Sequence, residues 1–203
     1  MAFNKKNKTL EDVLLKYNLQ YRESLLSIET NFEPTEVLKS DLEFTFKEVD
    51  YKASEAAIRE TVIFPILKDA MKHFSDDLTI WIEKPINYDK DLSGVPDYLI
   101  AKKSAKGKIF FDSPCVAVVE AKRDDFIGGW AQSALEMFAI QKINDKTELP
   151  VYGIVTNGDT WQFAVLIGDT FIAYRGSYSL PDVKEVLNVL CTILANCQKQ
   201  FKS

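Results

Sequence analysis

The feature of this sequence that most restricts its fold is an apolar run, residues 116–119, followed by Glu120, Ala121 and Lys122. Such a run is typical of a strand that is buried on both faces. Because side chains alternate along a strand, Glu120 and Lys122 point to the same side. A charged group at the end of a buried strand is costly to leave unpaired. The run therefore predicts a carboxylate and an ammonium together at the edge of an apolar core, unless the strand ends there in solvent.

Hydrophobic periodicity around this strand alternates between helical and extended patterns. Helices are expected at residues 54–74, with a kink at Pro65, at 130–142 after Gly128-Gly129, and from Pro181 onward. Strands are expected at residues 80–82, 96–101, 115–122, 151–156, 160–167 and 170–174, with hairpin turns at 157–159 and 168–169. Residues 42–49 fit a half-buried strand or the start of a helix. No repeat or linker divides the chain, so residues 1–203 are expected to form one mixed α/β domain, with a helical extension over about residues 1–40.

A second acid, Asp97, directly precedes an apolar stretch. If that stretch pairs in antiparallel fashion with residues 115–122 through the charged loop near residues 102–111, Asp97 comes beside Glu120. Neither carboxylate has an obvious permanent basic partner, and two like charges disfavour each other's ionisation. A divalent cation would relieve this, and oxygen ligands select Mg²⁺ or Mn²⁺. The alternative for Asp97 is an ordinary turn residue.

Two helices contribute further polar candidates. At about 100° per residue, Glu55 lies in line with the apolar Ile58, whereas Glu60 lies off that face. Glu55 is therefore expected to point inward, although a helix N-terminus also favours an acid for its dipole. Gln132, on the following helix, could hydrogen-bond a ligand near Glu120, although a solvated helix face also explains it.

Composition excludes several other kinds of protein. Hydrophobic residues make up 46% of the chain and charged residues 27%, which argues against disorder. The 3 cysteines lack C-x-x-C spacing, which favours reduced thiols in the cytoplasm, and no apolar run is long enough to cross a bilayer. The single histidine, His73, makes histidine-dependent triads and zinc sites hard to build, and no phosphate-binding glycine loop is present. Catalytic chemistry is left to carboxylates and lysine.

The formal net charge of −5 means that any contact with DNA depends on local basic patches. Three groups of basic residues are candidates for such a patch, each of them also explained as solvated surface. They are Lys5, Lys6 and Lys8; Lys102, Lys103, Lys106 and Lys108; and Lys122 with Arg123.

Taken in order, these residues resemble the PD-(D/E)XK nuclease superfamily, which has the restriction-endonuclease-like fold. The resemblance rests on Glu55 in a helix, the Pro-Asp pair that ends at Asp97, the Glu-Ala-Lys run at residues 120–122 and the later Gln132. Residues 151–158 and 160–163 are in addition similar to nuclease-like domains of type I restriction subunits. The resemblance covers about residues 54–167, and its motifs are individually short.

The resemblance implies a mixed central sheet flanked by helices and a Mg²⁺ or Mn²⁺ site between strands. Asp97 and Glu120 would hold the metal, with Glu55 as a direct or water-mediated ligand. Lys122 would orient or help to deprotonate the attacking water, or stabilise charge on the phosphate, and Gln132 would assist. The implied activity is metal-dependent hydrolysis of DNA phosphodiester bonds, as an endonuclease in restriction or DNA repair.

A second expectation is a catalytically inactive protein of the same fold that acts as a binding or scaffold module. The 203 residues contain no helicase, methyltransferase or recognition domain, and the chain is acidic. A partner subunit would then supply recognition, while a homodimer would suit an enzyme that cuts two strands. A glycosidase-like carboxylate enzyme is less favoured, because Lys122 would have no task in it. In each case the expected location is the cytoplasm.

Overall fold

The strand predicted from the apolar run is β6 (Cys115–Ala121), all of whose residues are buried. The structure, a computed structural model, describes residues 9–201. The other strands of its main sheet are β1 (Gln20–Ser24), β2 (Leu78–Ile82), β5 (Tyr98–Lys102), β7 (Val151–Thr156), β8 (Thr160–Ile167), β9 (Thr170–Tyr174) and β10 (Tyr178–Ser179). Their order is β1-β9-β8-β7-β6-β5-β2, with β10 paired to β8, and β3 (Ile86–Asn87) and β4 (Ser93–Gly94) form a separate ribbon.

The main sheet is mixed. β6 runs parallel to β7, and β1 runs parallel to β9. The other paired strands of this sheet are antiparallel. The strands predicted at residues 151–156, 160–167 and 170–174 have the predicted bounds. Gly158 and Gly168 have φ values of +85° and +58° in the hairpin turns between them, where glycine is favoured.

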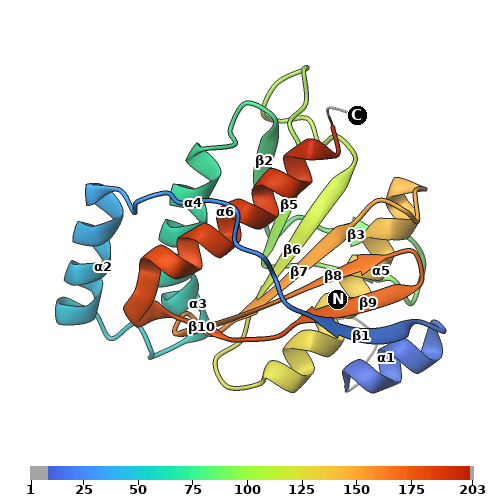
Figure 1. Ribbon diagram of the computed structural model, residues 1–203, viewed down its shortest axis with the longest axis horizontal. Helices are drawn as coiled ribbons and strands as arrows, with labels where there is room; N and C mark the ends of the chain where they lie inside the picture. Colours follow the sequence, from blue (N-terminus) through green and yellow to red (C-terminus); the bar gives the residue numbers. More distant parts are fainter. Residues whose placement is uncertain (1–8, 202–203) are drawn as a thin grey trace.

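Helices cover both faces of the sheet (Figure 1). They are α1 (Leu10–Lys16), α2 (Glu36–Glu48), α3 (Glu55–Ile58), α4 (Phe64–Lys72), α5 (Phe126–Asn144) and α6 (Val183–Lys199). One core cluster joins one face of the sheet to α2, α4 and α6, and a second joins the opposite face to α1 and α5. This mixed sheet between helices confirms the predicted α/β class.

The N-terminal part is less helical than predicted. α1 begins after Thr9, whose side chain accepts a hydrogen bond from the backbone of Asp12. Residues 20–24, assigned by pattern to helix, instead form the edge strand β1, which pairs with β9. All five residues of β1 are exposed, so no buried alternation marks it as a strand in the sequence.

Residues 42–49, for which a strand was one of two predictions, belong mostly to the helix α2. Its buried positions Leu38, Leu42 and Thr45 follow helical spacing, whereas Phe44 and Phe46 are exposed. The apparent alternation of apolar residues in this segment therefore did not indicate a strand.

The helix predicted over residues 54–74 consists of α3, a π-helical segment (Arg59–Ile63) and α4. Pro65 lies in the first turn of α4, and its missing N–H leaves the carbonyl of Thr61 without the usual helical donor. The hydroxyl of Thr45 in α2 donates to that carbonyl at 3.4 Å. The predicted disturbance at Pro65 therefore takes the form of a π-helical turn just before the proline.

The three cysteines are free and buried, in agreement with the expected reduced thiols. Among the helices described for residues 9–201, none combines the length and apolar character of a membrane-spanning segment.

Candidate active site at the end of strand β6

Asp97 and Glu120 meet where β5 and β6 pair. Tyr98 lies opposite Val119 in this antiparallel pair, which places Asp97 across from the end of β6 as predicted. The backbone N–H of Ala121 donates to Asp97 Oδ2 at 2.8 Å. The Asp97 carboxylate is therefore held against the strand that carries Glu120 and Lys122.

Glu120 and Lys122 lie on the same side of β6, as the alternation of side chains predicts. Lys122 Nζ donates to Glu120 Oε2 at 3.1 Å, and only 1% of the Glu120 side chain is exposed. Burial lowers the pKa of Lys122, but the negative charges of Glu120, Asp97 and Glu55 outweigh this effect, and the pKa is raised. Lys122 is therefore a protonated ammonium among acids.

Asp97 has a basic partner that the sequence pattern did not reveal. Arg59, in the π-helical segment, donates from Nη1 to Asp97 Oδ1 and from Nη2 to Glu83 Oε1, the latter at 2.8 Å. The expectation that the two carboxylates lack a permanent basic partner is therefore wrong for Asp97. A signal was available, since Arg59 follows Glu55 by four residues and so lies one helical turn further on.

Glu55 comes close to this group, but from outside the core. It is the first residue of α3 and is exposed, so the prediction that it points inward is wrong. Only the next turn, at Ile58, reaches the core. Glu55 Oε1 accepts a hydrogen bond from the backbone N–H of Arg123 at 3.3 Å, and its charge acts on Lys122.

Gln132 is bound to a residue to which no role had been assigned. Its Nε2 donates to Glu136 Oε1 at 3.2 Å, one turn further along α5. Glu136 is fully buried against Glu120. Its signal in the sequence was an acid between Leu135 and Met137, within a segment that is otherwise almost entirely apolar. We refer to Asp97, Glu120, Lys122 and Glu136 as the carboxylate cluster.

The two buried glutamates share one electrostatic problem. Burial raises the pKa of both carboxyls, and the negative charge of Glu120 raises that of Glu136 further. The pKa of Glu120 rises less than burial alone would cause, because hydrogen bonding with Glu136 and Lys122 and the positive charge of Lys122 lower it. Glu120 Oε1 and Glu136 Oε2 are buried and have no hydrogen-bond partner. A proton held between the carboxyls would supply a donor for the pair.

The beginning of α5 lies close to this cluster because residue 129 has no side chain. A Cβ there would come within 3.0 Å of Lys122 Cγ and 2.8 Å of Val155 Cγ1. The helix starts four residues before the predicted position, with Gly128 and Gly129 inside it, and Asp125 caps it by accepting from the N–H of Gly128.

A divalent cation at this cluster would need oxygen atoms that are not committed to protein donors. Both oxygens of Asp97 have donors, whereas Glu120 Oε1 is buried without one. Within residues 9–201, no group of three or more His, Cys, Asp and Glu side chains is arranged to hold a metal ion. The orphaned carboxylate oxygens nevertheless match the ligand chemistry of Mg²⁺ and Mn²⁺. Cation binding by Glu120 and Asp97, with Glu55 nearby, stays a prediction.

The predicted basic patches lie in different places. Lys5, Lys6 and Lys8 lie outside the described residues. Residues 102–108 are at the end of β5 opposite to Asp97, away from the cluster. Arg123 is near it and lines a surface hollow of about 380 Å³ together with Lys52, Asp124 and Asp159.

Comparison with models of known protein families found no match, and comparison with curated proteins found none either.

Proposed function

We propose that this chain hydrolyses phosphodiester bonds of DNA with Mg²⁺ or Mn²⁺, with the carboxylate cluster as its active site. One observation carries the proposal: strands β5 and β6 bring Asp97, Glu120 and Lys122 together, and Glu55 acts on the same lysine from α3. This is the set of residues for which the sequence resembles a PD-(D/E)XK nuclease. A charged group of this kind, largely buried at a strand end, is costly to maintain without a function.

Asp97 and Glu120 would hold the cation, which when bound supplies an activated water and offsets the charge that develops on the phosphate. Lys122 holds its proton and can donate to a phosphate oxygen. Arg59 fixes the orientation of Asp97, and the backbone of Ala121 holds its other oxygen. Glu136 and Gln132 position Glu120 from behind.

The test is cleavage of single-stranded and double-stranded DNA and of RNA by the purified chain with Mg²⁺ or Mn²⁺. We expect cleavage of DNA, reduced at least 100-fold in Asp97→Ala and Lys122→Ala, the scale on which loss of a catalytic group acts. Lys39→Ala, which removes an exposed lysine on α2, should cleave like the wild type. Circular dichroism must show that the variants are folded. Undiminished cleavage by folded Asp97→Ala and Lys122→Ala would contradict this site.

A catalytically inactive binding or scaffold module is the second candidate, and the Arg59–Asp97 ion pair favours it. An arginine that neutralises Asp97 takes the place that a cation would otherwise fill. Calorimetric titration with Mn²⁺ separates the two functions. Mn²⁺ binding by the wild type that is lost in Asp97→Asn supports the nuclease. If the wild type binds no Mn²⁺ but Arg59→Gln does, the result supports the scaffold.

A further inference from the structure

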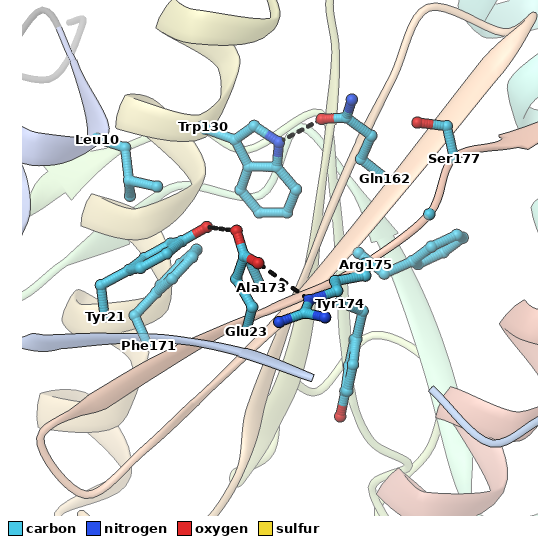
Figure 2. A pocket seen from close by; sticks show the side chains of 12 residues that line it. Leu10, Tyr21, Glu23, Trp130, Gln162, Phe171, Ala173, Tyr174, Arg175 and Ser177 are labelled. Carbon is cyan, nitrogen blue, oxygen red and sulfur yellow. Dashed lines mark hydrogen bonds and ion pairs between the residues drawn. The ribbon is translucent and has the colours of Figure 1, made fainter. Parts of the chain in front are cut away.

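An aromatic pocket lies on the sheet surface beyond the start of α5 (Figure 2). Its volume is about 370 Å³, within the range of small-molecule sites. We use the name aromatic pocket for six of its lining residues. They are Tyr21, Glu23, Trp130, Gln162, Phe171 and Arg175, from β1, α5, β8, β9 and the end of β9.

The pocket is on the same face of the sheet as the carboxylate cluster. Glu120 pairs with Val155 and Val155 with Gln162, and residues paired across strands share a face. Gln162 contacts Trp130 of α5 just as Glu120 contacts Glu136 of α5. Two strand spacings of about 4.8 Å separate the backbone at Glu120 from that at Gln162, or about 10 Å.

Aromatic rings form the floor and one wall. Phe171 is almost fully buried, Tyr21 lies parallel to it within 16°, and Trp130 meets it edge-on at 88° with ring centroids 5.8 Å apart. Because Tyr21 and Trp130 are thus at a steep angle to each other, a flat ring stacked on one would meet the other edge-on. Both arrangements are favourable for aromatic groups.

Polar groups surround this apolar floor. Trp130 Nε1 donates to Gln162 Oε1 at 2.7 Å, which directs the amide nitrogen of Gln162 away from the indole. Glu23 accepts from Tyr21 Oη and from Arg175 Nε, each at 3.0 Å. The Arg175 side chain is 64% exposed, and its hydrogen bond to Glu23 comes from Nε.

We propose that the aromatic pocket binds one deoxynucleotide unit of a single-stranded segment of the substrate. This rests on the proposed action on DNA. The base stacks on Trp130 or Tyr21, the amide of Gln162 meets the base edge, and the terminal guanidinium nitrogens of Arg175 bind the phosphate. A site for phosphate alone would not need the aromatic floor, and a site for an apolar group would not need the exposed arginine.

The test uses the full-length chain in EDTA, so that cleavage does not enter. Binding of the four deoxynucleoside monophosphates, their deoxynucleosides and a single-stranded four-nucleotide DNA is measured by calorimetry. We expect the oligonucleotide to bind more tightly than any monophosphate, and Trp130→Leu to raise Kd about tenfold to hundredfold, the value of one stacked base. Tyr21→Leu, at a 49% exposed position, tests stacking if Trp130→Leu does not fold.

Arg175→Gln has a distinct readout: it should abolish the preference for the monophosphate over the deoxynucleoside. Arg22→Gln is its matched control, since Arg22 lies on β1 between Tyr21 and Glu23 and points to the opposite face. It removes the same charge and should leave that preference unchanged. Equal effects of the two variants would overturn the phosphate contact.

The two proposals fail separately. DNA cleavage without measurable binding of monophosphates or oligonucleotide in EDTA would overturn the aromatic pocket as a nucleotide site. Binding that depends on Trp130 and Arg175, and that persists in Asp97→Ala, supports the pocket even when no cleavage is found. Binding of monophosphates but not of the oligonucleotide would overturn the assignment to a DNA strand.

Discussion

The carboxylate cluster and the aromatic pocket lie on one face of the sheet and both contact α5, but the charged groups of the cluster are buried and those of the pocket are exposed. In the cluster, Glu120 and Glu136 are almost fully buried, and each has an oxygen without a donor. In the pocket, the ion pair of Glu23 and Arg175 is largely exposed above an apolar floor. Water cannot replace a lost partner in the first site, whereas it can in the second.

The number of ion pairs in a site therefore says little about how much they contribute to the free energy of unfolding. A buried charge that loses its partner keeps its whole desolvation cost, while an exposed one is solvated again. Substitutions in the cluster should therefore change the free energy of unfolding much more than substitutions in the pocket. Four variants examine this comparison.

The largest effect is expected for Lys122→Ala. It leaves Glu120 buried without its ammonium partner, and we expect a loss of about 3 to 5 kcal/mol in the free energy of unfolding at neutral pH. Urea denaturation measures it. Lys39→Ala removes an exposed lysine paired with Glu36 and should cost less than about 0.5 kcal/mol. Similar losses in the two variants would show that solvent replaces the ammonium of Lys122 at Glu120, which contradicts the prediction.

Glu136→Gln should have the next largest effect, with the opposite sign. Because the pKa of Glu136 is raised above its ordinary value of 4.5, the folded protein retains a proton that the unfolded chain releases, and stability falls as the pH rises from 4.5 through the raised pKa. The amide keeps an acceptor for Gln132 and adds a donor toward Glu120. We expect it to stabilise the fold above that range by about 1 to 3 kcal/mol.

Urea denaturation at pH 5 and pH 8 measures this effect. The decline in stability between the two pH values should be smaller in Glu136→Gln than in the wild type. Glu43→Gln, at an exposed position of α2, should keep the decline of the wild type. An unchanged pH dependence in Glu136→Gln would show that Glu136 does not retain the proton.

A smaller effect is expected in the aromatic pocket for Gln162→Leu. Trp130 Nε1 loses its acceptor, but the indole is only half-buried and water can approach it. The expected loss is about 0.5 to 1.5 kcal/mol by thermal or urea denaturation. Gln162→Glu keeps an acceptor and should lose less. A loss as large as that of Lys122→Ala would remove the distinction between the two sites.

The smallest effect on stability is expected for Arg175→Gln. Its pair with Glu23 is solvent-exposed, so the free energy of unfolding should change by less than about 1 kcal/mol, and by less still at high salt. The same denaturation experiment checks this value. A larger loss would mean that the ion pair holds β1 on the sheet. Weaker nucleotide binding by Arg175→Gln could then result from the loss of β1 as well as from the loss of a phosphate contact.

Much of the carboxylate cluster was accessible from sequence because charges interrupt a buried strand. The pairing of Asp97 with the end of β6 followed from a short apolar stretch and one charged loop. Arg59 and Glu136 were missed although each carried a signal within its own helix, because their partners Asp97 and Glu120 come from other elements. Glu55 lies near Lys122 as predicted, but its side chain is exposed and does not point into the core.

The aromatic pocket had no sequence signal at all. Its residues come from β1, α5, β8, β9 and the end of β9, and none breaks the pattern of its own segment. β1 was even assigned to a helix, because an exposed edge strand carries no alternating burial. Such a site forms only when β1 joins β9 and α5 packs against the sheet.

Sequence patterns alone predict the alternation of helices and strands after residue 54, the burial of β6 on both faces and the meeting of Asp97, Glu120 and Lys122. The alternation follows from local periodicity, and the meeting of the charged groups follows from one antiparallel pairing of two consecutive strands. Three features emerge only from the folded chain: Arg59 neutralises Asp97, Glu136 lies buried against Glu120, and rings from β1, α5 and β9 share one pocket. Those contacts form only when the π-helical segment, α5 and β1 pack against the sheet, and the periodicity of a single segment carries no information about that packing.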